Sequence, residues 1–234
     1  MLHYYVYGLI SARIKFMKKQ ILISLVIFIV IFCFSASGLG EGAKTVQLFN
    51  GKNLNNWVQQ KPGGWVVENR MITPGDKPGG YIWANGNYDN FELEMDFKIS
   101  KGCNSGVFFR TDPRNPVQGG FEIQILDSYG KSKIGKHDCG ALYDALAPSS
   151  NNAKSAGEWN HIKIIVSDAY VKVVLNGTQV TNADLDQWVV ARKNPDGSRN
   201  KFRTALKDLP RTGSIGLQYH GKPVWFKNIK LKHL

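Results

Sequence analysis

Apolar and polar residues alternate in short runs along the chain from Thr45 onward. The clearest run is 91–99, FELEMDFKI, in which apolar residues at odd positions alternate with charged residues at even positions. Successive side chains of a β-strand point to opposite faces of the sheet, so this run predicts a strand with one buried face and one solvated face. A similar run, 121–126, reads FEIQIL, and it places Glu122 and Gln124 opposite Phe121, Ile123 and Ile125.

Runs of this kind recur from Thr45 to the end of the chain and are separated by turn residues such as Asn176-Gly177. About a dozen short strands, with turns roughly every 8–12 residues and no long helical pattern, are typical of an antiparallel β-sandwich. The segment 183–212 breaks this rhythm, because it is polar apart from isolated apolar residues such as Trp188 and Phe202. It is expected to be a long surface loop, of the kind that can form a lid over one end or face of the sandwich.

The N-terminal part of the chain has a different pattern. Residues 21–34 are an apolar run, shorter than the ~20 residues of a membrane-spanning helix. Basic residues precede the run and the small residues SASG follow it. This arrangement predicts a secretory signal peptide, with an uncleaved membrane anchor as the alternative. Residues 1–43 are therefore assigned to an N-terminal extension, and residues 44–234 to one β-sandwich domain.

Charge and cysteine content restrict the partners. The chain carries a net charge of +12, and residues 44–234 keep +9 from 26 basic and 17 acidic residues. No basic run is interleaved with aromatic residues, so a nucleic acid is not an expected partner. A membrane is expected only through the N-terminal segment, and the oligomeric state is left open.

Cys103 and Cys139 are expected to form a disulfide after export, and two cysteines do not suggest a zinc site.

Three of the predicted strands place unusual polar groups on one face. Asn104 shares a face with Arg110, Glu122 with Gln124, and Gln218 with His220. Amide, guanidinium, carboxylate and imidazole groups suit the binding of hydroxyls and the transfer of protons. A shared concave site is one interpretation; exposed strand residues, or a structural Arg110–Glu122 ion pair, are the alternative.

Three further residues are candidates for substrate binding. Tyr143 and Asp144 follow a glycine in GALYDALAP and could lie at the rim of the site, and Asp127 begins the turn after GFEIQIL. No nucleophile elbow, phosphate loop or His-x-x-x-His pair is present in the sequence, so serine hydrolase, nucleotide and zincin chemistry receive no support.

Motifs spread over Leu48–Leu231 carry a family resemblance. In chain order they read LFNGKNLNNW, CNSGVFFR, GFEIQILD, GALYDALAP, GEWNHIKI, LNGTQV, GSIGLQYHG and VWFKNIKL. The chain resembles the 3-keto-disaccharide hydrolase domain family, whose fold is a concanavalin A-like jelly roll of the lectin and glucanase type. The resemblance implies an exported bacterial protein, periplasmic, secreted or attached to the envelope. Cys103 and Cys139 depart together from the family pattern, which favours the disulfide.

The resemblance also implies a substrate, a glycoside oxidised to a ketone at carbon 3. That carbonyl acidifies the proton on carbon 2, so a base can start an elimination of the group at carbon 1 that hydration turns into net hydrolysis. We expect His220 to be the base, Arg110 to stabilise the oxyanion, and Glu122 to orient them or to act as the acid. Asn104, Gln124 and Gln218 would hold hydroxyls.

No cofactor is predicted, although a divalent metal could replace Arg110. The alternative function is a non-catalytic carbohydrate-binding module of the bacterial envelope.

Overall fold

The computed structural model describes residues 44–234 of the chain. The predicted signal peptide or anchor, residues 1–43, lies outside the described residues. Within residues 44–234, no helix has the length and apolar character needed to cross a membrane.

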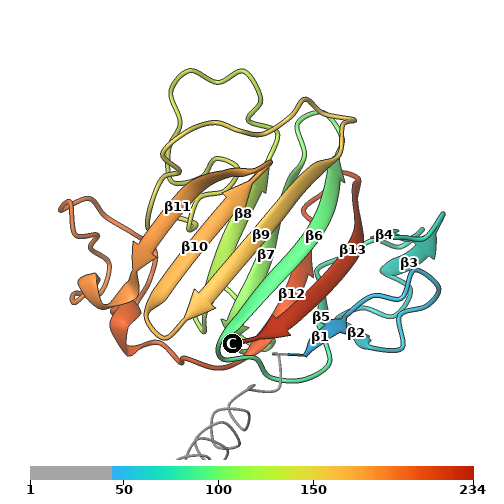
Figure 1. The fold of residues 1–234 in the computed structure, drawn as a ribbon, viewed down its shortest axis with the longest axis horizontal. Helices are drawn as coiled ribbons and strands as arrows, with labels where there is room; N and C mark the ends of the chain where they lie inside the picture. Colours follow the sequence, from blue (N-terminus) through green and yellow to red (C-terminus); the bar gives the residue numbers. More distant parts are fainter. Residues whose placement is uncertain (1–43) are drawn as a thin grey trace, which may run out of the picture. The chain divides into compact units, whose positions relative to one another are not determined.

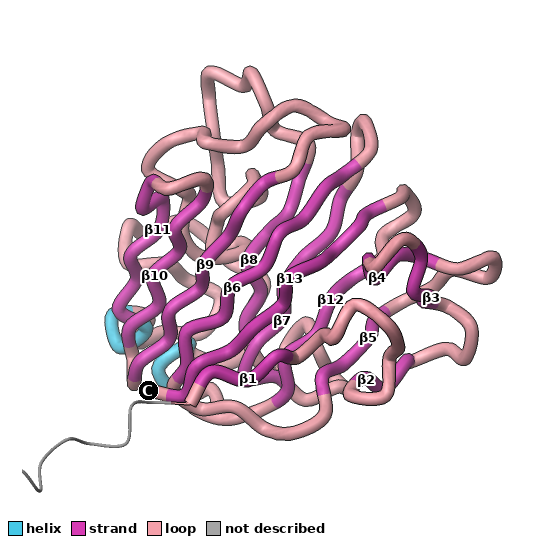
Figure 2. Tube along the Cα trace, turned by 45° about the vertical axis from the view of Figure 1, so that its right-hand side comes forward, coloured by secondary structure: helices cyan, strands magenta, loops and turns pink. Residues whose placement is uncertain are grey.

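Two antiparallel sheets lie against each other as two layers (Figures 1 and 2). The larger sheet has the order β11-β10-β9-β6-β13-β4-β3, with β1 also paired to β13. Its strands are β1 (Thr45–Gln47), β3 (Trp65–Glu68), β4 (Met71–Pro74), β6 (Phe91–Ile99), β9 (Asn160–Ser167), β10 (Tyr170–Leu175), β11 (Thr178–Asp184) and β13 (Val224–His233). The smaller sheet, β2-β5-β12-β7-β8, contains β2 (Trp57–Gln59), β5 (Tyr81–Ala84), β7 (Asn104–Thr111), β8 (Phe121–Leu126) and β12 (Ser214–Gln218). The all-β sandwich predicted from the sequence is confirmed.

The alternating sequence of β6 explains why this strand lies at the centre of the larger sheet. Every odd position from Phe91 to Ile99 is buried, and every even position is only partly covered. On the outer face, Glu94 lies 2.6 Å from Lys163 Nζ and 2.7 Å from Lys230 Nζ. Hydrogen bonds from these two lysines lower the pKa of Glu94 to about 2. The strand thus contributes apolar side chains to the core and a paired carboxylate to the outer surface.

Strand β8 of the smaller sheet has the same alternation with a different outer face. Phe121, Ile123 and Ile125 belong to the hydrophobic core between the sheets. Glu122 and Gln124 point to the outer face, yet they are only 6% and 2% exposed. Something must therefore cover these two polar side chains on the side away from the core.

Arg110 departs from the alternation predicted for its strand. Its φ of 48° lies in the left-handed region, and the pairing of β7 with β12 shifts at this point. The guanidinium is buried and donates to Asp89 O at 2.7 Å, Asp168 O at 2.6 Å and Asn90 Oδ1 at 3.0 Å. Arg110 therefore ties the smaller sheet to the β9–β10 turn of the larger sheet and to the segment that leads from β5 into β6. The guanidinium therefore does not lie beside Glu122, where the sequence pattern predicted it.

This cross-link yields a test by denaturant unfolding. Replacing Arg110 with Met should lower the free energy of unfolding by about 1–3 kcal/mol, because three hydrogen bonds of a buried guanidinium are lost. The matched control is Arg114→Met, which removes an exposed arginine four residues further along the chain. The control should unfold like the wild type; an equal effect of the two variants would contradict the cross-link.

Candidate active site on the outer face of the smaller sheet

The outer face of the smaller sheet collects polar and aromatic side chains from four strands. Strand register sets Phe108 opposite Glu122 and Gly106 opposite Gln124, while Gly216 faces Trp83 and Gln218 faces Tyr81. Four of the residues predicted from the sequence are thereby brought onto one surface: Asn104, Glu122, Gln124 and Gln218. We call this surface, together with the loop residues that cover it, the candidate site.

Two glycines make room for the side chains of the candidate site. A Cβ atom at Gly106 would overlap the Glu122 carboxyl group, and one at Gly216 would overlap the ring of Trp83. Both side chains therefore lie close to the backbone of a neighbouring strand. No other residue type leaves this space.

Three aromatic rings form one half of the candidate site. Tyr81 stacks on Trp83 with 5.2 Å between ring centroids, and Phe108 meets Tyr81 edge-on at 5.1 Å. Trp83 and Phe108 are buried but do not belong to the core between the sheets. The outer face therefore has its own small apolar cluster beside the polar groups.

Glu122 is the buried carboxylate of the candidate site. Burial raises its pKa to about 7, and the nearby Lys201 opposes this rise only in part. The Lys201 Nζ atom lies 3.7 Å from Glu122 Oε2. A carboxyl group with a pKa near neutrality can both accept and give up a proton under physiological conditions.

Lys201 comes from the long polar segment 183–212, which lies beside β11 and is orange in Figure 1. Its ammonium group lies 3.9 Å from the centroid of the Tyr143 ring, and its side chain is 22% exposed. Burial disfavours the charged form of each side chain, so it lowers the pKa of Lys201 and raises the pKa of Tyr143. Lys201 was not predicted from the sequence; the only signal was the unusual length of its loop.

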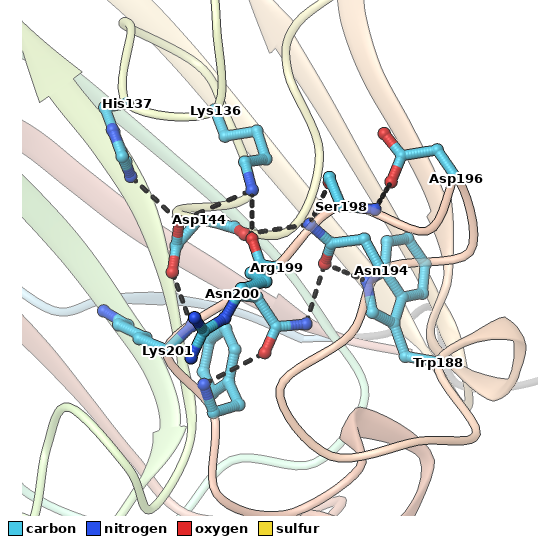
Figure 3. A network of polar contacts seen from close by, with 11 residues as sticks. Lys136, His137, Asp144, Trp188, Asn194, Asp196, Ser198, Arg199, Asn200 and Lys201 are labelled. Carbon is cyan, nitrogen blue, oxygen red and sulfur yellow. Dashed lines mark hydrogen bonds and ion pairs between the residues drawn. The ribbon is translucent and has the colours of Figure 1, made fainter.

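Asp144 holds the loop in this position, as Figure 3 shows. Its Oδ2 atom accepts a 2.6 Å hydrogen bond from the backbone N–H of Lys201, and His137 Nε2 lies 3.0 Å from its Oδ1. The carbonyl of Asp144 accepts from Asn194 Nδ2 at 3.3 Å. Asp144, predicted to bind substrate, thus has both carboxylate oxygens engaged within the protein. It positions Lys201 over the candidate site.

The loop has its own internal network of hydrogen bonds (Figure 3). Asn194 Oδ1 accepts from Trp188 Nε1 at 2.9 Å and from Asn200 Nδ2 at 2.8 Å. Trp188 and Phe202 are buried in the core cluster, and two short 3-10 helices, η1 (Leu185–Gln187) and η2 (Leu206–Asp208), flank this region. The segment predicted as a surface loop is therefore fastened to the sandwich.

Among the described residues, one buried amide oxygen of the candidate site has no hydrogen-bond partner. Gln124 Nε2 donates to Asn104 Oδ1 at 2.9 Å. The other amide atom, Gln124 Oε1, is buried and finds no hydrogen-bond partner among the described residues. An acceptor of this kind on a polar face is available to a ligand hydroxyl.

Two predicted site residues lie at the margin of this surface or outside it. His220 is exposed in the turn after β12, two residues beyond Gln218, and makes no hydrogen bond or ion pair within residues 44–234. Asp127 Oδ2 accepts a 2.7 Å hydrogen bond from the Gly102 N–H and so holds the turn before β7. Of the described residues, no three His, Cys, Asp or Glu side chains are grouped as a metal site would need.

The predicted disulfide between Cys103 and Cys139 is absent from the described residues. Both cysteines are buried free thiols. The Cys103 sulfur lies 3.6 Å from Asn104 O and 3.8 Å from Lys222 O, so it points toward the turn before β13. The backbone of Leu126 is the hydrogen-bonding neighbour of the Cys139 thiol. Burial raises the pKa of Cys103 to about 11 and that of Cys139 to about 12, so both stay protonated.

Comparison with known proteins gives relatives of the same architecture. Residues 44–232 match the model of the 3-keto-alpha-glucoside-1,2-lyase-like domain family. A 3-keto-disaccharide hydrolase from Bacteroides thetaiotaomicron is 32% identical over an alignment of 227 residues, and the match covers 81% of this chain and 78% of that protein.

Solved structures extend the comparison. A crystal structure from Parabacteroides distasonis, of a protein with the provisional name glycosyl hydrolase, is 36% identical and superimposes with a TM-score of 0.75. It covers 82% of this chain and is itself covered completely. A galectin-like protein from Bacillus subtilis, 14% identical with a TM-score of 0.54 over 83% of this chain and 96% of its own, shares the fold alone. The chain belongs to the 3-keto-alpha-glucoside-1,2-lyase-like domain family.

Proposed function

We propose that this protein cleaves the glycosidic bond of 3-keto-glycosides on the outer face of its smaller sheet. The observation that carries the proposal is Glu122, a carboxyl group 6% exposed with a pKa raised to about 7, beside the Lys201 ammonium at 3.7 Å. The name of the Bacteroides relative and the family description support the same substrate class.

The chemistry of such a substrate requires a base and a positive charge. The ketone at carbon 3 acidifies the C–H bond at carbon 2, so a base removes that proton and the electron pair forms an enolate. The enolate then expels the group at carbon 1 with its bonding electrons, and a proton neutralises the leaving oxygen. Addition of water to the resulting double bond completes net hydrolysis.

Glu122 fits the base, and Lys201 fits the group that stabilises the enolate oxygen. A carboxylate with a pKa near 7 is a stronger base than an ordinary one and is still substantially ionised at neutral pH. The Lys201 ammonium supplies the positive charge that the sequence pattern predicts for Arg110. In a partly dry environment such a charge stabilises a developing oxyanion strongly.

The rest of the outer face suits a sugar ring. Tyr81, stacked on Trp83, offers an apolar surface to the C–H groups of a ring. Gln124, Asn104 and Gln218 offer amide groups to its hydroxyls. His220, the base expected from the sequence, stays the competing candidate; its exposure and its lack of a partner favour Glu122 in its place.

Export of the protein is part of the proposal and rests on the pattern of residues 13–38, a basic flank, an apolar run and a small-residue exit. N-terminal sequencing of the protein isolated from its native host would show whether the leader has been removed. A periplasmic, secreted or envelope location would match a glycan-derived substrate.

Substitutions at the candidate site should separate the two bases. With a 3-keto-glucoside as substrate, Glu122→Gln should lower kcat/KM by about 10²–10⁴-fold, and Lys201→Met by about 10²–10³-fold. His220→Ala should stay within about a few-fold of the wild type, and Glu158→Gln, an exposed carboxylate change, serves as the control.

Product analysis by mass spectrometry, with and without a chelator, completes this test. A large loss in His220→Ala with Glu122→Gln still active would contradict our assignment of the base. Binding of the substrate by the wild type without any product would identify a carbohydrate-binding module in place of an enzyme.

The raised pKa of Glu122 should also appear in stability. Folding favours the protonated carboxyl, so this stabilisation is fully present below the unfolded-state pKa of 4.5 and is lost as pH rises through about 7. Glu122→Gln cannot titrate, so its free energy of unfolding should rise relative to that of the wild type by about 1–3 kcal/mol between about pH 4.5 and about pH 8.5.

Urea unfolding at both pH values measures this difference. Glu158→Gln, at an exposed position, should keep the wild-type pH dependence. Parallel curves for Glu122→Gln and the wild type would mean that Glu122 is not perturbed.

The space at Gly106 gives an independent test of the geometry. Alanine at this position should displace the Glu122 carboxyl group, because the new Cβ would overlap it, and kcat should fall by about 10-fold or more. Gly135→Ala, where a Cβ meets no atom within 4 Å, is the control. Wild-type kcat in Gly106→Ala would show that the position of the carboxyl group does not matter.

A further inference from the structure

A second surface with features of a binding site lies on the larger sheet. A groove of about 830 Å³ is lined by residues of β6 and β13, the β3–β4 turn, the segment 47–51 and Trp159, which precedes β9. The lining includes Lys98, Lys227, Arg70 and Trp159. Its volume lies within the range of about 300–1,000 Å³ that is usual for small-molecule sites.

Tryptophan rings hold the lysines of the groove in place. Lys98 is the cross-strand neighbour of Trp225, and its Nζ atom lies 4.7 Å from the centroid of that ring and 5.2 Å from that of Trp159. Lys227 Nζ lies 3.9 Å from the Trp159 ring centroid. Cation–π contacts of this kind fix an ammonium group without neutralising its charge.

Among the described residues, the positive charges of the groove have no carboxylate partner. Neither lysine, nor Arg70 at the β3–β4 turn, makes an ion pair within residues 44–234. Asp96, the cross-strand partner of Lys227, accepts instead from Asn228 Nδ2 at 2.6 Å and lies 2.8 Å from His161 Nδ1. By contrast, Lys163 and Lys230, on the same face of the sheet, are both paired with Glu94. The groove therefore keeps an excess of positive charge.

We propose that this groove binds an acidic oligosaccharide, one whose sugars carry carboxylate or sulfate groups. The ammonium and guanidinium groups would pair with the anionic groups, and Trp159 offers apolar surface to the sugar rings. Gln47 and Asn69 add amide groups that can bind hydroxyls. This combination of amide, aromatic and cationic groups fits a charged sugar better than it fits an isolated inorganic anion.

The groove is distinct from the candidate active site and goes beyond the proposed function. Glu122 and its neighbours lie on the outer face of the smaller sheet, whereas the groove lies on the larger sheet. The two sites can therefore be occupied together. An acidic glycan held on one sheet would keep the protein near a polysaccharide while the other sheet handles a small glycoside.

Titration calorimetry with the protein and defined oligosaccharides tests this proposal. Oligogalacturonate and a sulfated chondroitin oligosaccharide serve as acidic probes, and a maltooligosaccharide of similar length serves as the neutral probe. The double variant Lys98→Met, Lys227→Met should weaken binding of at least one acidic probe about 10-fold or more. Lys98→Arg, Lys227→Arg should retain binding, because the charges are kept.

Two controls separate this groove from general attraction to a basic protein. Lys172→Met removes an exposed lysine of β10 on the same sheet and should bind like the wild type, and so should Glu122→Gln. Unfolding curves of all variants establish that they are folded. The proposal is overturned if no acidic probe binds, if Lys172→Met weakens binding as much as the double variant, or if phosphatidylglycerol vesicles bind while the oligosaccharides do not.

Discussion

The pleat of the smaller sheet is the constraint on which both the core and the candidate site depend. Each apolar residue that β8 directs into the core forces its neighbour onto the outer face, so Ile123 and Glu122 cannot be placed independently. The core face of β8 contributes stability through its apolar side chains, and the outer face carries the polar side chains of the candidate site. A shift of one residue in register would bury the carboxylate between the sheets and expose the apolar side chains.

The properties of Glu122 arise from neighbours that are distant in sequence. Gly106 on β7 leaves space for the carboxyl group, and Lys201 reaches it from a loop that Asp144 holds. Burial dominates the electrostatics, since the pKa of Glu122 rises although a positive charge lies nearby. The fold thus raises the pKa of this carboxyl group by excluding water. The Lys201 ammonium offsets part of the free-energy cost of burying the carboxyl group in its ionised form.

Sequence periodicity predicted the features that depend on local geometry. The sandwich and the faces of β6 and β8 follow from a period of two, which regular strand backbone must obey. Arg110 could not be placed, because one residue with positive φ turns its side chain away from the face that the period assigns. Lys201 could not be found either, because a loop contact depends on how the loop folds back and not on any repeat. The prediction of a disulfide between Cys103 and Cys139 failed for a similar reason, since the sequence pattern does not set the direction in which a thiol points.

The hydrogen bond from the Lys201 N–H to Asp144 links the loop to the acidity of the site. The loop that this bond fastens brings Lys201 over Glu122, so a change that loosens the loop would hydrate the carboxyl group and lower its pKa toward the ordinary 4.5. The pKa of Glu122 therefore depends also on loop residues such as Asn194, which contacts Asp144 rather than Glu122. A change in the loop would thus alter the acidity of the outer face while every strand residue of that face stays the same.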